Sequence, residues 1–145
     1  MAAAAWKVYN EAKKYLLTAD LDLNAGAVVM RLAKASSNAS TFTLSTLASV
    51  TVLCSGGISD NSKTIGSITV TAGASAKVIR FDSTAVIFTA SGANFSVLYA
   101  VIGVSGGKAL CWSKLSSSGF TVTTPNTLTI TPNASGIFEL SGGVT

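Results

Sequence analysis

The amino-acid sequence predicts a mainly β protein, an antiparallel β-sandwich or barrel-like domain with one N-terminal α-helix. From residue 64 onward, apolar residues alternate with Thr and Ser, which is the period-2 pattern of half-buried strands. Three long stretches (35–59, 83–107 and 115–138) carry no charge, yet Ser, Thr, Gly and Asn interrupt their apolar residues throughout. Short turn sequences separate the patterned runs at regular spacing, as they do in sandwiches and barrels.

The uncharged stretch 83–107 is long enough to cross a membrane, since about 20 residues suffice. The turn sequence Ser91–Asn94 lies in its middle, however, and would place polar groups in hydrocarbon. Two strands and a turn account for this stretch better, so we expect no membrane association.

Composition indicates one domain whose surface is covered by other protein. The 145 residues are 48% hydrophobic and only 11% charged. A domain of this size holds a core without metal or disulfides. Soluble monomers seldom expose large apolar patches, so we expect burial in an oligomer or a larger assembly. We divide the single domain 1–145 into an N-terminal helix over 1–19 and a β domain over 27–145.

The N-terminal segment shows the spacing of an amphipathic helix. Trp6, Tyr9, Lys13 (or Ala12) and Leu16 recur every three or four residues, while charged residues occupy the other faces. The spacing therefore predicts a helix with one apolar stripe.

Period-2 patterning predicts the strands of the β domain, beginning with one over 27–34. The segment 42–52 is ambiguous, because Ser45 or Thr46 could cap a short helix while Thr-rich alternation allows a strand. The clearest predicted hairpin joins 120–123 to 127–131. Further strands are expected at 67–71, 77–81, 86–89, 95–104, 109–112 and 137–140.

The chain lacks the side chains that most enzymes use. It has no His, the usual general base and the commonest metal ligand. Two near-motifs meet at Ser105: Gly103–Gly107 matches the nucleophile-elbow spacing, and Ser105–Lys108 matches Ser-x-x-Lys. The first needs a His and the second a helix start, so a plain β-turn is the better interpretation. We expect no enzyme, no catalytic or metal site and no cofactor.

Charge and cysteine content indicate neither nucleic-acid binding nor secretion. The net charge is +4, and the ten basic residues are scattered instead of forming a stripe, so we expect no direct contact with nucleic acid. Lys7 follows Trp6 at once and leaves no apolar core for a secretion signal. Cys54 and Cys111 are therefore expected to be reduced thiols, although the sequence leaves open whether they meet.

A series of blocks in a fixed order covers most of the chain. The blocks are Trp6–Leu17, Asp20–Leu23, Ala27–Leu32, Thr46–Val50, Phe81–Gly92, Tyr99–Ile102, Phe120–Thr123, Asn126–Ile130 and Gly136–Leu140. In this pattern the chain resembles a family of small tailed-bacteriophage virion proteins, the head decoration or capsid cement proteins. Thr51–Cys54 departs from the pattern, because it is more apolar than expected there.

The resemblance implies a non-enzymatic structural protein of the virion. Such a protein decorates and cements the phage capsid by bridging subunits of the major capsid protein, and it is assembled in the cytoplasm of the bacterial host. The family picture also implies a homo-oligomer, with a trimer expected. The interface would use the apolar stripe of the helix, since aromatic anchors are typical hot spots, or the same stripe would pack on the chain's own sheet. The expected interface residues are Trp6, Tyr9, Lys13, Leu16 and Trp112.

Two alternatives remain from the sequence. The chain could be another virion part, such as a tail-tube, adaptor or tail-tip subunit. It could also be a carbohydrate-binding β-sandwich in which Trp112, Tyr99 or Phe95 stacks on sugar, although core packing is the simpler interpretation of these aromatic residues.

Overall fold

The computed structural model describes residues 5–18, 23, 27–58, 60–73, 75 and 78–141, and it confirms a mainly β domain with one α-helix. Every strand pair is antiparallel. No helix within these ranges is long and apolar enough to cross a membrane. The elements in chain order are β1 (Lys7–Val8), α1 (Asn10–Leu17), β2 (Val28–Ala33), η1 (Asn38–Ser40), η2 (Leu47–Ser49), β3 (Ser62–Thr64), β4 (Thr69–Ala72), β5 (Val78–Asp82), β6 (Val86–Thr89), β7 (Phe95–Val97), β8 (Tyr99–Val104), β9 (Ala109–Lys114), β10 (Phe120–Val122), β11 (Thr127–Ile130) and β12 (Phe138–Ser141).

The N-terminal helix is shorter than predicted, because the residues before it form a strand. β1 pairs with β9, and α1 begins only at Asn10. Tyr9 precedes the helix in an extended conformation, and its N–H donates to the carbonyl oxygen of Leu110 at 3.1 Å. The edge of β9 therefore binds backbone that the side-chain spacing had assigned to the helix. Residues 1–4 and 19 of the predicted helix lie outside the described ranges.

The body of the molecule is a five-stranded sheet in the order β1-β9-β8-β2-β3. β2 matches the predicted strand over 27–34, and it is buried on both faces except at Arg31. The register of β8 with β9 shifts between Ile102 and Gly103. A Cβ at Gly103 would lie 2.4 Å from the carbonyl oxygen of Lys108, so this irregular pairing requires glycine. The ambiguous segment 42–52 contains a single 3-10 turn, η2.

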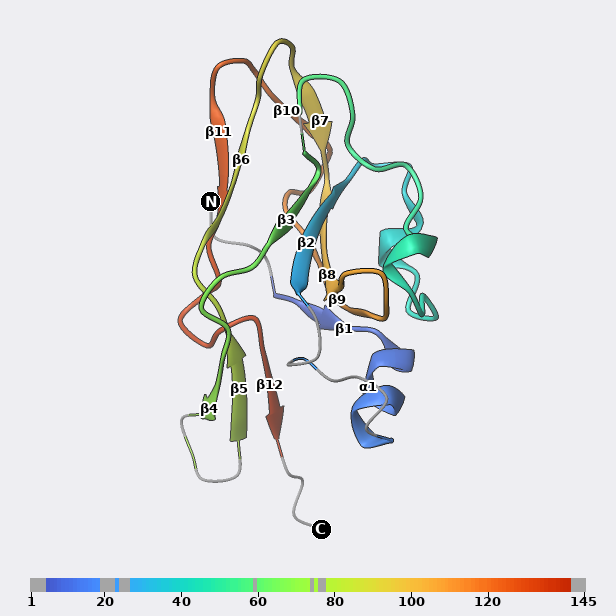
Figure 1. Cartoon of the computed structure of the whole chain (residues 1–145), viewed down its shortest axis with the longest axis vertical. Helices are drawn as coiled ribbons and strands as arrows, with labels where there is room; N and C mark the ends of the chain where they lie inside the picture. Colours follow the sequence, from blue (N-terminus) through green and yellow to red (C-terminus); the bar gives the residue numbers. More distant parts are fainter. Residues whose placement is uncertain are drawn as a thin grey trace.

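The predicted hairpin over 120–131 is wrong, because its two strands pair with different partners. β10 pairs with β7 and β11 pairs with β6, so the chain crosses between two two-stranded sheets at 123–126. The turn between β6 and β7 makes the same crossing, and we call these four strands with their two crossings the arches (Figure 1). The arches are bonded together: Thr124 N–H donates to Asn94 Oδ1, and Ala90 N–H donates to the carbonyl oxygen of Asn126, both at 2.9 Å.

A three-stranded sheet, β12-β5-β4, extends from the opposite end of the molecule and is called the arm (Figure 1). The β4–β5 hairpin confirms the two predicted strands there, and β12 pairs with the other side of β5. Phe81 and Phe138 stack at the base of the arm, with ring centroids 5.1 Å apart. Phe81 is buried in the main core, which joins the arm to the body.

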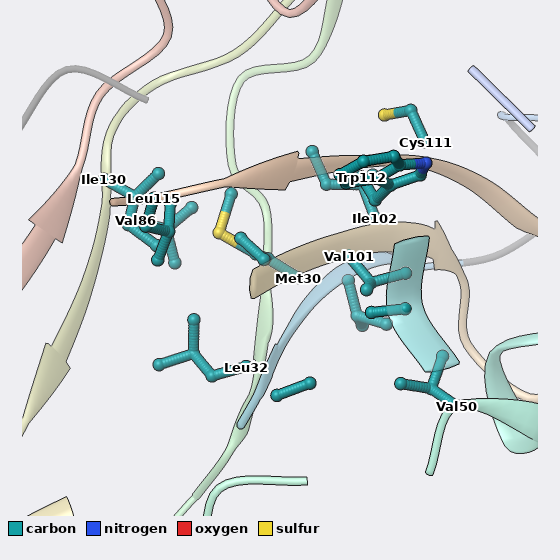
Figure 2. Close-up of a cluster of buried hydrophobic side chains, with 14 of the residues drawn as sticks. Met30, Leu32, Val50, Val86, Val101, Ile102, Cys111, Trp112, Leu115 and Ile130 are labelled. Carbon is teal, nitrogen blue, oxygen red and sulfur yellow. The ribbon is translucent and has the colours of Figure 1, made fainter. Parts of the chain in front are cut away.

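One hydrophobic core runs through the body and the arches. Figure 2 shows part of it, with Met30 and Leu32 of β2 and Ile102 of β8, all fully buried. Cys54 and Cys111 belong to the same core, and both thiols are free. The structure thus answers the question that the sequence left open: the two cysteines form no disulfide.

Candidate docking surface

The described residues hold no group of side chains suited to bind a metal ion. No three His, Cys, Asp or Glu side chains gather within them. The near-motifs at Ser105 fall on the turn between β8 and β9, where Gly106 adopts a φ of +71°. Ser105 N–H donates to the carbonyl oxygen of Ala27 at 2.9 Å. This is the predicted β-turn, whereas a nucleophile elbow needs a turn from a strand into a helix.

The two cysteine thiols are buried and held in the protonated form. Desolvation raises the pKa of Cys54 to about 12, although the positive charge of Lys34 acts in the opposite direction. The Cys54 thiol donates to the carbonyl oxygen of Ser96 at 3.0 Å. Burial also raises the pKa of Cys111. Because the thiolate is the nucleophile and the metal ligand, both thiols are suited to packing and not to chemistry.

Two of the predicted anchors, Trp6 and Tyr9, lie in the chain's own core. Tyr9 has no exposed surface, and its hydroxyl donates to the carbonyl oxygen of Ala39. Burial, with a smaller effect from Cys111, raises the pKa of Tyr9. Trp6 is only 8% exposed. This half of the stripe thus packs in the chain's own core, which was the alternative to an interface, and neither side chain is available as a surface anchor.

Trp112, the third aromatic anchor, is also covered by its own chain. It is 6% exposed, and the rings of Phe42 and Tyr99 meet it edge-on with centroids 5.9 Å away. The Lys7 ammonium lies 5.1 Å from the centre of the Trp112 ring, a cation–π contact. Phe95 is 1% exposed. The Trp112 and Phe95 rings pack in the core, so the structure offers neither as an open platform for sugar stacking.

The other two predicted residues, Lys13 and Leu16, remain at the surface of α1. With Leu17 and Leu140 they line a groove of about 220 Å³ between the end of the helix and β12. Leu17 is 89% exposed, which makes it the most exposed large apolar side chain among the described residues. Three leucines with one lysine beside them form an apolar groove with a basic neighbour.

The arm continues this apolar surface. Cross-strand register places Leu140 opposite Ile79, and it places Val70 opposite Phe81 on the same face. Phe81 is buried at the base, but Val70 is 61% exposed, Ile79 52% and Leu140 44%. The arm is therefore apolar along one face, and the described residues leave the outer part of that face uncovered.

The opposite face of the arm is mainly polar. Register places Glu139 opposite Arg80 and Arg80 opposite Thr71. The Arg80 guanidinium forms an ion pair with Glu139, with an Nη2–Oε1 distance of 3.0 Å. The arm is thus an amphipathic sheet whose polar side suits water and whose apolar side suits a protein partner.

We define the docking surface by five exposed or half-buried apolar residues of the helix end and of the outer arm, namely Leu16, Leu17, Val70, Ile79 and Leu140. Sequence reasoning found only Leu16 and its neighbour Lys13. The alternation of the strands gave the signal for the other apolar residues, but it did not say which face the body leaves uncovered. Comparison of the chain with models of protein families, with curated proteins and with solved structures finds no match.

Proposed function

We propose that this chain is a non-enzymatic structural protein of a tailed-phage virion, which decorates and cements the capsid by bridging subunits of the major capsid protein. The observation that supports the proposal is the docking surface. Three of its residues, Leu17, Val70 and Ile79, are more than half exposed on a chain whose body and arches bury most of their apolar side chains. We propose the major capsid protein as the partner because the sequence blocks resemble those of decoration proteins.

The composition of the docking surface suits a protein partner. Fully burying a Leu, Ile or Val side chain contributes roughly 1.5–3 kcal/mol, so a few such residues give useful affinity. Lys13 lies at the edge of the groove, in the position of a polar rim around an apolar centre.

The position of the docking surface suits bridging. Leu17 belongs to the helix beside the body, whereas Val70 belongs to the strand of the arm farthest from β12. The arm extends away from the body (Figure 1). A protein that rests on one shell subunit through its helix end can therefore place the arm on a neighbouring subunit.

Substitution of the docking surface tests the partner. The purified chain is mixed with capsids of the virus that carries it, prepared without this protein, and binding is measured by cosedimentation. Leu17→Lys and Ile79→Lys are expected to weaken binding at least tenfold. Ile87→Lys is the matched control, because Ile87 is 54% exposed on β6, away from the docking surface. Equal binding by all three variants would refute the proposed contact.

Copy number in purified virions separates the capsid from the tail. A decoration protein is expected in hundreds of copies that follow the capsid lattice, whereas a tail-tip subunit would be present in a handful. Virions without the protein should also lose resistance to heat and chelator. Low copy number would favour the tail alternative, and unchanged particle stability would rule out the cement role.

A further inference from the structure

The outer strand of the arm, β4, has an open edge. β4 ends the strand order β12-β5-β4 (Figure 1). Among the strands of the described chain, it alone has every residue exposed. An edge strand of this kind presents unpaired N–H and C=O groups that can template another strand.

The hydrogen-bond pattern identifies the backbone groups that face outward. Gly73 N–H donates to the carbonyl oxygen of Val78 at 2.7 Å, so these two residues are a bonded pair of the β4–β5 hairpin. Bonded residues alternate along an antiparallel ladder, and the next bonded residue of β4 is therefore Thr71. The N–H and C=O groups of Val70 and Ala72 then point away from β5, toward the open edge.

The edge of β4 lacks the features that usually keep edge strands apart. Proteins protect such edges with charged side chains, Pro or bulges. The edge strands of the body carry Lys7 on β1 and Lys63 on β3, and the other edge of the arm carries Glu139. β4 reads Thr-Val-Thr-Ala, with no charge and no Pro.

We propose that two copies of this chain pair through their β4 edges about a two-fold axis centred on Thr71. In this register Val70 of one copy lies opposite Ala72 of the other, and each Thr71 lies opposite its own equivalent. In this register both outward-facing residues of β4 pair with residues of β4 in the other copy. The two arms become one six-stranded sheet whose apolar faces lie on the same side.

Size and charge favour this pairing. The larger Val70 meets the smaller Ala72, and the two Thr71 side chains form a favourable Thr–Thr cross-strand pair. Among the described residues of the arm, the only cations are the Arg80 side chains, which in the paired copies would be three strand spacings apart, about 14 Å. That distance exceeds the Debye length of about 8 Å at physiological ionic strength, and each Arg80 is already paired with Glu139.

The β4–β4 contact is self-complementary, so it joins two copies into a closed dimer. A two-fold interface uses one self-complementary patch, whereas a three-fold ring needs two different patches on each copy. The β4 edge provides the first kind, so it supports a dimer contact and not the trimer expected from the resemblance. The inference does not rest on the proposed function, because the purified chain tests it with no capsid present.

Cysteine cross-linking tests the register. Thr71→Cys places two thiols at a non-hydrogen-bonded pair with Cα atoms about 4.5 Å apart, which a disulfide spans. Thr69→Cys is the matched control on the same face of the same strand, where the two Cα atoms would be about 14 Å apart. Under mild oxidation Thr71→Cys should form a reducible dimer at least tenfold faster than Thr69→Cys. Equal rates for the two variants, or no dimer with Thr71→Cys, would overturn the register.

A proline at the edge tests the pairing itself. The N–H of Ala72 points outward, so Ala72→Pro removes a donor to the second copy without removing a bond to β5. In the Thr71→Cys background it should reduce cross-linking at least tenfold, while the circular dichroism spectrum stays that of the parent. Undiminished cross-linking in a folded Ala72→Pro variant would contradict the proposal.

Discussion

The body and the arm are both antiparallel sheets, but they differ in how much of their apolar surface the chain itself covers. In the body, β9 buries five of its six residues, on both faces. In the arm, β4 buries none of its residues. The arches, like the body, cover apolar side chains, because β6 buries every second residue. Their turns are also bonded together.

This difference separates stability from interaction. Free energy of unfolding comes mainly from side chains that the fold removes from water, and the body and arches contain most of these. The arm keeps only its base, Phe81 and Phe138, within reach of that core. Its outer apolar residues add little to folding and remain available to a partner.

The strongest test of this difference is to make the same substitution, Leu→Ala, once in the body and once in the arm. Leu110 on β9 has no exposed surface, whereas Leu140 on β12 is 44% exposed. Leu110→Ala should reduce the free energy of unfolding by roughly 2–5 kcal/mol, since it leaves a core cavity. Leu140→Ala should change it by about 0.5 kcal/mol. Urea unfolding monitored by tryptophan fluorescence measures both, and equal losses would show that the arm is part of the core.

Close packing of the body predicts the next effect. A Cβ at Gly103 would meet the Lys108 carbonyl oxygen at 2.4 Å and Leu47 Cγ at 2.7 Å, whereas at Gly107 the nearest atom is 3.6 Å away. Gly103→Ala should therefore cost roughly 1–3 kcal/mol through overpacking, and Gly107→Ala should stay within about 0.5 kcal/mol of the parent. Thermal unfolding of the two variants tests this. A stable Gly103→Ala variant would mean that the β8–β9 bulge relaxes easily.

The buried thiols of the body predict a loss of stability in alkali. In the unfolded chain Cys54 releases its proton near its ordinary pKa of 9.0, but in the folded chain it does so near 12. The unfolded state therefore loses protons first, and stability falls as pH rises from about 9 toward 12. The urea midpoint should decrease between pH 8 and pH 10.5, and Cys54→Ala should show a smaller decrease. The same decrease in both proteins would place the titration elsewhere, at Cys111 or Tyr9.

Most strands could be predicted from the sequence, because alternation depends on which residues are apolar and not on which strand lies beside them. The predicted pairing of 120–123 with 127–131 was wrong for the same reason: alternation does not show which strand lies beside which. Val122 and Ile130 are buried in the observed arches, as they would be in a hairpin. The pattern of burial is the same in both arrangements, which differ in their strand pairings and in the turn-to-turn bonds at Asn94 and Asn126.

The site was harder to predict than the fold. Trp6 and Tyr9 are of the residue types that anchor interfaces, but the pairing of β1 with β9 places them in the core. Leu17 and Ile79 are of the residue types that usually lie in a core, but tertiary packing leaves them exposed. Which apolar residues stay uncovered is decided by contacts between distant segments, and a local pattern carries no record of those contacts.

The smallest expected effect concerns the polar face of the arm. The Arg80–Glu139 pair joins β5 to β12, and its side chains are 26% and 30% exposed. Exposed pairs contribute roughly 0.2–1 kcal/mol, so Glu139→Gln should lower the free energy of unfolding by no more than that. The difference should vanish in 1 M salt, where the Debye length falls to about 3 Å. A loss several times larger, or one that persists in salt, would mean that the ion pair holds the arm together. The arm would then be a folded unit with its own stability and not an extension supported at its base by Phe81.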